Sequence, residues 1–361
     1  MSPTVPDRIG EGYGREPMDP DLINSAWLSE VLGAPVTITA DKRIGDGLVG
    51  MNMRYSLQVP EGSGLPTSVI AKLPSPDPTS RATGIALRNY EREVKFYRDI
   101  APTVDIRVAH CYHGEWHESD GDFVLVLEDL APCEQGNQIT GCSADLARRS
   151  VVELARLHGP RWGDTALNDI EFLSRRSPED AVGLQALWGM FLPGFLATYS
   201  PYLETEGVEL IERFGVRIPD WVEGRDLPTT VTHGDFRLDN LMFESPNGGY
   251  PVATVDWQTP GQGPATADVS YFMGAGPLPE VRREIERVVI DEYLGALDGY
   301  GVAVGHDEFW HHYCRDAYGG IIMSVVASQI VGSSDRSEAM FAAMATRHTR
   351  HALDLGSEGL I

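Results

Sequence analysis

The sequence predicts a two-lobed α+β protein, with an antiparallel five-strand sheet in the first lobe and a mostly helical second lobe. Two observations support this fold class. Short apolar runs separated by glycine-rich turns fill the first third of the chain, as expected for strands. Farther along, apolar residues recur at helical spacing instead. The pattern changes close to residue 129, so we expect a first lobe of residues 1–129 and a second lobe of residues 130–361.

Five segments of the first lobe have the composition of strands: residues 36–44, 53–59, 69–73, 106–112 and 123–127. A helix over residues 21–32 precedes them and ends at Gly33, because glycine readily adopts the left-handed conformation of a helix C-cap. One further helix, over residues 81–100, follows the third strand and stops before Pro102.

Helical spacing dominates the second lobe. Ser143 is the expected N-cap of a helix that runs to His158. Further helical segments are expected over residues 309–330 and 337–355. Between them and the first helix lies a long helical region rich in aromatic residues, namely Trp188, Phe191, Phe195, Tyr199 and Tyr202.

Composition narrows the functional classes. The chain of 361 residues has a formal net charge of −24, which argues against a nucleic-acid or anionic-membrane partner. It suits a cationic substrate, or simply a soluble protein. No run approaches the roughly 18–20 apolar residues of a membrane span, and residues 1–21 lack a signal-peptide pattern. The four cysteines are widely spaced without a C-x-x-C pair, so a cytoplasmic location is expected.

The residues with the clearest chemistry lie in the run His233-Gly234-Asp235 and the segments after it. Asp235 precedes Asn240 by five residues, and Asp256 follows sixteen residues later. Phosphoryl transfer needs a carboxylate near the acceptor hydroxyl, and an amide plus a carboxylate to hold Mg²⁺ on the phosphates. The spacing is that of a kinase catalytic loop. It predicts Asp235 as the catalytic base and Asn240 and Asp256 as metal ligands; a polar turn between two strands is the alternative.

Two neighbours of Asp235 have competing interpretations. His233 could act as a base, but in this loop type it more often supports the backbone. Arg237 could offset charge on the transferring phosphoryl group, or it could form a structural salt bridge. Asp239 is interpreted as a solvated or supporting acid.

Gly45, Gly47 and Gly50 form a G-x-G-x-x-G pattern. A dinucleotide-binding site would require a helix directly after it, whereas the following residues alternate like a strand. Strand, glycine loop and strand predict a loop that covers nucleotide phosphates; an ordinary hairpin is the alternative.

Lys72 follows three apolar residues in the third strand, and the chain contains only two other lysines, Lys42 and Lys95. A buried lysine needs anionic partners. Nucleotide phosphates and a glutamate on the next helix would supply them, and Glu91 and Glu93 are the candidates.

The His-Gly-Asp-x-x-x-x-Asn run resembles that of the aminoglycoside phosphotransferase and choline kinase group. Glu93, before Phe96 and Tyr97, matches the E-x-x-F-Y pattern of these families and is therefore the favoured partner of Lys72. The segment around Asp268 resembles their Gly-Asp-Pro-x-x-Asp-Leu-Ala motif. The D-x-Q ending at Gln258 resembles the ecdysteroid-kinase-like branch, and the catalytic run also resembles the kinase-like domain of some acyl-CoA dehydrogenase fusions.

This resemblance implies a protein-kinase-like fold that binds Mg²⁺ with ATP, or with GTP, and phosphorylates a hydroxyl of a small molecule. It implies that the backbone of Glu128 and Leu130 meets the adenine. It also implies that His233 and Asp268 support the catalytic loop.

The acceptor is left open between two classes. The aromatic helical region favours a hydrophobic hydroxylated compound, with plain helical core as the alternative explanation of its aromatics. The twelve acids against five arginines between residues 163 and 230 suit an aminoglycoside instead. A catalytically inactive nucleotide-binding or scaffold protein is a further alternative. A protein kinase is disfavoured by Gly234 and by the short interval between Asp256 and Asp268.

Overall fold

The computed structural model describes residues 19–45, 49–175, 177–224 and 227–361, so Gly47 of the glycine pattern lies outside the described residues. The chain forms two compact units. Unit 1 comprises the described residues up to Pro102 together with Val108–Pro132 and Val255–Gln258. Unit 2 comprises Thr103–Arg107, Cys133–Thr254 and Thr259–Ile361.

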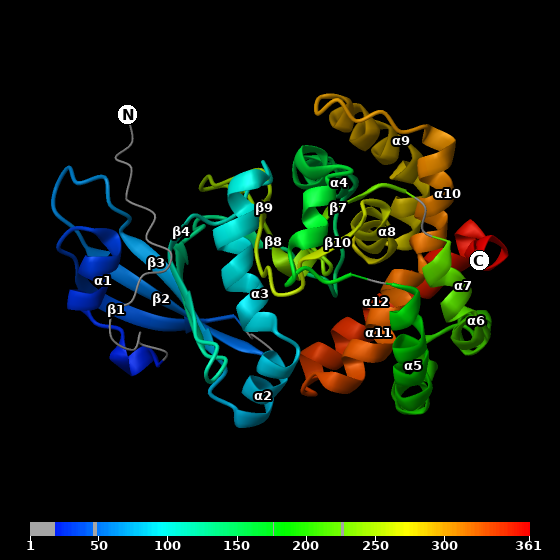
Figure 1. Cartoon of the computed structure of the whole chain (residues 1–361), viewed down its shortest axis with the longest axis horizontal. Coiled ribbons are helices and arrows are strands. Elements are labelled where there is room, and N and C mark those ends of the chain that lie inside the picture. The colour runs from blue at the N-terminus through cyan, green and yellow to red at the C-terminus, as the bar shows by residue number, and fades with distance from the viewer. Residues whose placement is uncertain (1–18, 46–48, 176, 225–226) are drawn as a thin grey trace. The chain divides into compact units, whose positions relative to one another are not determined.

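Unit 1 is built on a five-strand sheet in which every neighbouring pair is antiparallel (Figure 1). The order is β1-β2-β3-β5-β4. The strands are β1 (Thr37–Ile44), β2 (Gly50–Gln58), β3 (Ser68–Pro74), β4 (Cys111–Trp116) and β5 (Phe123–Glu128). The predicted antiparallel five-strand sheet is confirmed.

Helices cover both faces of this sheet. They are α1 (Ser25–Leu32), α2 (Pro78–Ala86) and α3 (Asn89–Lys95). Leu28 of α1 belongs to a buried cluster with Val124 of β5, whereas the preceding residue, Phe123, stacks on Tyr90 of α3 with ring centroids 4.5 Å apart. Successive side chains of a strand point to opposite faces. Therefore α1 and α3 lie on opposite sides of the sheet (Figure 1).

The fourth strand begins later than the prediction of 106–112. Residues before it are held by unit 2: the N–H of Arg107 donates to Glu153 at 2.8 Å, and its carbonyl accepts from the N–H of Thr254, also at 2.8 Å. Because these backbone groups are already paired, regular pairing with β5 starts only at Cys111.

The predicted helix over 81–100 is wrong as a single element. It is divided into α2 and α3 at Arg88, whose φ of 58° lies in the left-handed region, and α3 passes into a wider π-turn over Phe96–Ile100. Gly84 of α2 packs so closely on the Tyr90 ring that a Cβ there would lie 2.6 Å from it. This close packing folds α2 back onto α3. In contrast, α1 ends at Gly33 with a left-handed C-cap, as predicted.

Unit 2 is mostly helical and contains two small sheets (Figure 1). Ser143 caps the first helix as predicted, and the predicted segment 309–330 is divided at Ala317. The helices are α4 (Ala144–His158), α5 (Pro178–Tyr199), α6 (Thr205–Phe214), α7 (Ile218–Glu223), α8 (Thr266–Ala275), α9 (Pro279–Asp298), α10 (His306–Asp316), α11 (Tyr318–Ile330) and α12 (Asp335–Leu355). The strands are β6 (Glu134–Gln135), β8 (Leu241–Phe243) and β9 (Ala253–Thr254) in one sheet, and β7 (Thr229–Thr232) and β10 (Gly261–Pro264) in the other.

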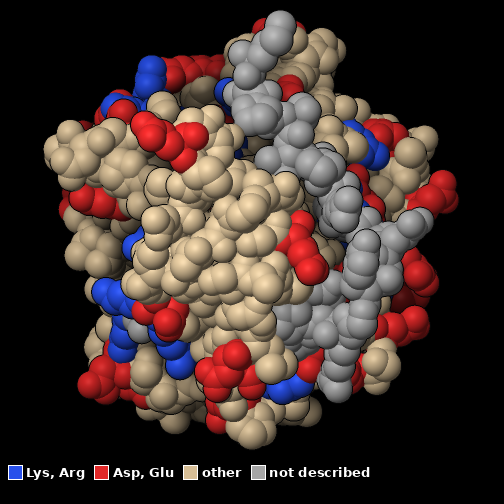
Figure 2. All heavy atoms as spheres, turned by 90° about the vertical axis from the view of Figure 1, so that its left-hand side faces the viewer, with Lys and Arg blue, Asp and Glu red and all other residues tan. Residues whose placement is uncertain are grey.

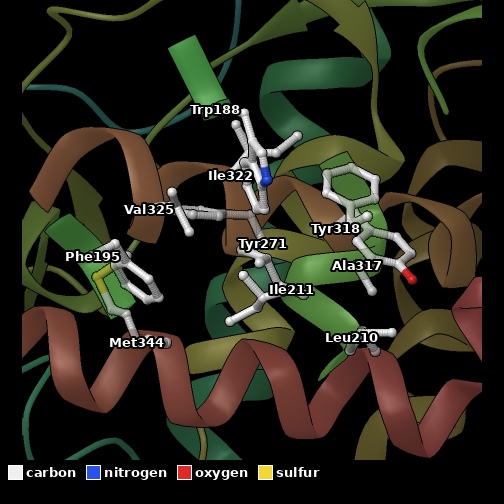
Figure 3. Packing of buried hydrophobic residues seen from close by; sticks show 14 of the residues in the cluster. Trp188, Phe195, Leu210, Ile211, Tyr271, Ala317, Tyr318, Ile322, Val325 and Met344 are labelled. Carbon is white, nitrogen blue, oxygen red and sulfur yellow. The ribbon is translucent and has the colours of Figure 1, made fainter. Parts of the chain in front are cut away.

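The aromatic residues of α5 belong mainly to the core of unit 2. Trp188, Phe195 and Tyr199 are all buried in one hydrophobic cluster, and Figure 3 shows Phe195 beside Met344 of α12. These three aromatics therefore match the alternative of plain helical core, because their rings fill space between helices.

The outer side of α5 is apolar as well. Val182 is 70% exposed and Met190 is 69% exposed. By length and composition, the helical stretch 178–202 could cross a membrane. In its most apolar 18-residue segment, 17% is buried inside the protein. A long apolar helix can equally serve as a core helix, so this feature is weak evidence for a membrane segment.

Two histidines of α12 are fully buried. Both ring nitrogens of His348 and Nδ1 of His351 have no hydrogen-bond partner among the described residues. Nε2 of His351 lies 2.9 Å from the Tyr313 hydroxyl and 3.8 Å from Glu286. Burial, and then the charge of Arg347, lower the pKa of His348 to about 3. Burial, Arg282 and His348 lower the pKa of His351 well below its ordinary value.

We expect these histidines to make the protein less stable at mildly acidic pH. Their folded pKa values are depressed, so the unfolded chain binds protons first, and stability falls as pH drops below about 6.5. From pH 7.5 to pH 5.5, the pair should cost about 2–3 kcal/mol of unfolding free energy. Urea unfolding at the two pH values measures this loss. His348→Asn should remove about half of this pH dependence. An equal loss of unfolding free energy in the variant and the wild type would contradict the assignment of the effect to His348.

Candidate active site

Lys72 is the centre of a charged group within unit 1. Its ammonium lies 2.7 Å and 2.8 Å from the two carboxylate oxygens of Glu93, and 2.7 Å from Oδ1 of Asp256. Strand β3 carries the lysine and α3 carries Glu93. Burial opposes the charge on Lys72, but Asp256 and Glu93 together raise its pKa above the usual value. The lysine therefore stays protonated.

The alternative glutamate, Glu91, has other partners. It pairs with Arg88 at 2.7 Å and with Lys95 at 2.6 Å. Hydrogen bonds from Arg88, and then from Lys95, lower the pKa of Glu91 to about 2 despite its burial. Of the two candidates, Glu93 is therefore the residue that contacts Lys72.

The two motifs around Asp256 and Glu93 contact each other. Trp257 stacks on Phe96 of the E-x-x-F-Y pattern, with ring centroids 3.8 Å apart. Gln258 accepts a hydrogen bond from Asn89 at 3.4 Å. Asp256 itself has a φ of 66°, which non-glycine residues rarely adopt. The segment is thus held in an uncommon conformation that brings the Asp256 carboxylate to Lys72.

The described glycines of the G-x-G-x-x-G pattern lie between β1 and β2. Gly45 follows β1 with a φ of 67°, and Gly50 begins β2. A Cβ on Gly50 would lie 3.7 Å from Cε of Lys72 and 3.8 Å from Nε2 of Gln258. A strand follows the glycines, so the requirement for a dinucleotide-binding helix is not met.

The segment after β5 is held by polar contacts within unit 1. Oε2 of Glu128 accepts from the N–H of His110 at 2.9 Å. Asp129 accepts from Arg54 at 2.8–2.9 Å and from Ser68 at 2.7 Å, while Leu130 is buried. These contacts define the backbone path at Glu128 and Leu130, the two positions expected to meet the nucleotide base.

In unit 2, the start of the catalytic run depends on Gly234. Its φ is 80°, and a Cβ there would collide with the carbonyl of Thr259. Asp268 of α8 accepts hydrogen bonds from the N–H groups of His233 at 2.7 Å and Gly234 at 3.0 Å. Only glycine satisfies both the conformation and the close approach. The glycine of His-Gly-Asp therefore has a steric explanation.

His233 and Asp268 are both buried behind the loop. Nδ1 of His233 accepts from the N–H of Asp235 at 3.2 Å, so the ring contacts the loop backbone. Nε2 of His158 lies 3.3 Å from Asp268. Burial disfavours the Asp268 charge, but hydrogen bonds from His158 and the backbone of His233 outweigh it and lower the pKa.

The Asp235 carboxylate contacts three side-chain donors. Oδ1 accepts from the hydroxyl of Tyr271 at 2.7 Å. Oδ2 accepts from Nε of Arg237 at 3.0 Å and from Nδ2 of Asn240 at 2.9 Å. Its side chain remains 22% exposed, so a ligand can still reach it. The three contacts hold this carboxylate in one orientation.

Arg237 and Asp239 form a supporting network. Arg237 bridges Asp235 and Asp239, the latter at 2.8 Å. Asp239 is buried and also pairs with Arg336 at 3.2 Å and accepts from the N–H of Gln138 at 2.9 Å. Asp239 is thus a buried support of the loop and not a solvated acid.

Two residues of this centre had not been identified from the sequence. Tyr271 lies on α8, one helical turn after Asp268. This helical spacing is the sequence feature that could have placed Tyr271 next to the loop. Gln138 is fully buried: it accepts from the N–H of Leu238 at 3.0 Å and donates to the carbonyl of Ala275 at 2.8 Å. A glutamine in a loop before α4 carries no recognisable motif.

The donor types suit a hard cation that retains phosphate and water ligands. The amide nitrogen of Asn240 makes hydrogen bonds to Asp235, so its side-chain carbonyl oxygen would be the atom that binds a metal. The Asp256 carboxylate is 37% exposed. The described parts of the chain contain no cluster of three or more His, Cys, Asp or Glu side chains that could hold a metal. Mg²⁺ on a nucleotide needs only one or two protein carboxylates, so these residues fit it.

Comparisons with known proteins identify the family of the chain. A family model described as the phosphotransferase enzyme family matches residues 79–301, which is more than half of the chain. A segment of 103 residues, 28% of the chain, is 35% identical to acyl-CoA dehydrogenase family member 10 of Mus musculus. That match covers 9% of the mouse protein, so the chain corresponds to a small part of it.

Solved structures show the same fold at low sequence identity. A Ralstonia eutropha JMP134 protein assigned to the aminoglycoside phosphotransferases has a TM-score of 0.52 and 16% identity, over 91% of this chain and 97% of that chain. Choline kinase of Cryptosporidium parvum Iowa II has a TM-score of 0.51 and 12% identity, over 89% and 91%. The GDP complex of wild-type aminoglycoside 2'-phosphotransferase-IIIa has a TM-score of 0.51 and 12% identity, over 86% and 93%. The predicted two-lobed kinase-like fold is therefore confirmed.

Proposed function

Since the chain belongs to the phosphotransferase enzyme family and is a small-molecule kinase, we propose that it transfers the γ-phosphate of ATP to a hydroxyl group with the help of Mg²⁺. The observation that carries this proposal is the Asp235 carboxylate, which three donors hold in place while it remains accessible. A carboxylate held in this way can orient an acceptor hydroxyl and receive its proton.

The proposed nucleotide-binding groups are the residues that the sequence indicated. In unit 1, Lys72 would neutralise phosphate charge while Glu93 positions it. Asn240 and Asp256 would hold Mg²⁺, which neutralises charge on the phosphates. Gly45, Gly47 and Gly50 would cover the phosphates, and the backbone of Glu128 and Leu130 would meet the base. ATP is the expected nucleotide, with GTP as an alternative.

The lobe roles remain part of the proposal. Residues 1–129 would act as the nucleotide-binding lobe and residues 130–361 as the catalytic and substrate-binding lobe. We propose a cytoplasmic location and no nucleic-acid or membrane partner. On the face shown in Figure 2, acidic groups are interspersed with a smaller number of basic groups, which agrees with the net charge of −24.

We favour an acceptor with an apolar body and a few polar groups. Residues 181–203 carry no charged side chain, and Val182, Leu187 and Met190 are exposed on α5. Such a surface suits an apolar molecule. An aminoglycoside is the alternative, based on the acids of 163–230. However, Glu204 and Glu209 already pair with arginines, which reduces the charge available to a polycation.

A screen of hydroxylated compounds tests the function. We expect substrate-dependent ADP release from Mg-ATP with hydrophobic alcohols such as steroids, macrolides or acyl alcohols. The KM of a hydrophobic acceptor should respond little to salt, whereas exposed charge contacts to a polycation are screened within about 8–10 Å. Met190→Ser should raise the acceptor KM, and Val216→Ser, at a residue that is 76% exposed but outside α5, is the matched control.

Three other outcomes would decide against parts of this proposal. Efficient phosphorylation of kanamycin-like compounds, with a KM that rises steeply with salt and ignores Met190→Ser, would establish the aminoglycoside alternative. Nucleotide binding without turnover of any acceptor would favour an inactive nucleotide-binding or scaffold protein. Phosphorylation of protein hydroxyls alone would indicate a protein kinase.

A further inference from the structure

The two oxygens of the Asp235 carboxylate have different surroundings. Oδ2 accepts hydrogen bonds from Arg237 at 3.0 Å and from Asn240 at 2.9 Å. Oδ1 accepts one, from the Tyr271 hydroxyl at 2.7 Å. A carboxylate offers about two lone-pair positions on each oxygen. Oδ2 is therefore fully used by these two donors, and Oδ1 retains one position for another donor.

We propose that Tyr271 is a positioning residue that directs the acceptor hydroxyl to Oδ1 of Asp235. This inference rests on the proposed kinase function and adds to it the oxygen that receives the proton. Tyr271 would occupy one lone pair of Oδ1 and prevent the carboxylate from rotating, so that the remaining lone pair points in one direction. Preorganised contacts of this kind hold a reactant near its attack geometry.

The structure holds Tyr271 firmly enough for this role. Its side chain is 6% exposed, and its ring stacks on His348, with centroids 5.2 Å apart and an angle of 20° between the planes. It shares α8 with Asp268, which binds the backbone at His233 and Gly234. One helix turn therefore anchors both the loop and the carboxylate that the loop carries.

The proton balance assigns different roles to the two residues. Burial, and then the negative charge of Asp235, raise the pKa of Tyr271 well above its ordinary value, so its hydroxyl remains a donor. During transfer, the acceptor oxygen forms a bond to the γ-phosphorus, and the bond from that phosphorus to the ADP oxygen breaks. The acceptor proton moves to Oδ1 of Asp235, and the Tyr271 proton stays on Tyr271.

Tyr271→Phe removes one oxygen atom and tests the inference. We expect kcat to fall about 10- to 100-fold, as for the loss of one hydrogen bond to a charged group. The KM and the calorimetric Kd for Mg-ATP should change less than twofold, because the lost hydrogen bond is made to Asp235 and not to Lys72, Asn240 or Asp256. Tyr313→Phe is the matched control: its buried hydroxyl bonds to Glu286 and His351, so it should lower stability without lowering kcat.

A double-mutant cycle separates positioning from a general structural effect. If Tyr271 acts through the Asp235 carboxylate, Tyr271→Phe should cause little further loss in an Asp235→Asn background. Equal losses in both backgrounds, or equal kcat for Tyr271→Phe and wild type, would overturn the inference and leave the kinase function intact. A wild-type enzyme that releases no ADP with any acceptor would overturn both.

Discussion

Asp235→Asn should lower kcat by about 10²–10⁴-fold, which is the range for loss of a general base. The amide keeps the size of the side chain and can still accept from Tyr271, but it cannot receive the acceptor proton. The substitution also removes the negative charge that pairs with Arg237. Steady-state kinetics with a saturating acceptor measure the effect.

Nucleotide binding provides the control for this variant. Calorimetry should show a nearly unchanged Kd for Mg-ATP, because Lys72 and Asp256 are untouched. Turnover equal to wild type would place the base elsewhere. His233 would be the first alternative, although its ring is buried and accepts from the N–H of Asp235. Loss of both turnover and nucleotide binding would instead indicate a disturbed loop.

Asp256→Asn should nearly abolish turnover, by about 10³-fold or more, because a bound metal supplies several kcal/mol of charge stabilisation. The carboxylate is a proposed Mg²⁺ ligand and also contacts Lys72 at 2.7 Å. Asn is preferable to Ala here. The φ of Asp256 is 66°, and Asn tolerates the left-handed region whereas Ala would add backbone strain. The loss can then be attributed to the missing charge.

Calorimetry with and without Mg²⁺ checks this expectation. The variant should lose the metal-dependent part of its ATP affinity and retain most of the metal-independent part. Asp41→Asn, at an exposed position of β1 in the same unit, is the matched control and should behave like wild type. Unchanged affinity for Mg-ATP in Asp256→Asn would contradict the assignment of Asp256 to the metal.

Much of the first unit could be predicted from short patterns. Strand-forming runs, the helix that ends at Gly33 and the lysine in the third strand depend on neighbouring residues, and the structure has them near their predicted places. The break at Arg88 and the late start of β4 could not be predicted. They depend on Tyr90 packing on Gly84 and on Glu153, which binds the backbone of Arg107 from 46 residues farther along the chain.

The aromatic residues of α5 show the same limit. Their spacing indicates a helix but not which side of that helix is covered, because apolar residues occur all round it. Packing against other helices decided that Trp188 and Phe195 are core residues, whereas Met190 is exposed.

The sequence by itself determined the fold class, and it indicated the residues from His233 to Asn240 as the proposed catalytic run because their spacing matches the needs of phosphoryl transfer. Only the tertiary structure decided that Glu93, and not Glu91, contacts Lys72. It alone placed Tyr271 against Asp235, 36 residues away along the chain. The physical reason is that a hydrogen bond between distant segments depends on how helices and loops pack, and packing is set by the whole core and not by any local pattern.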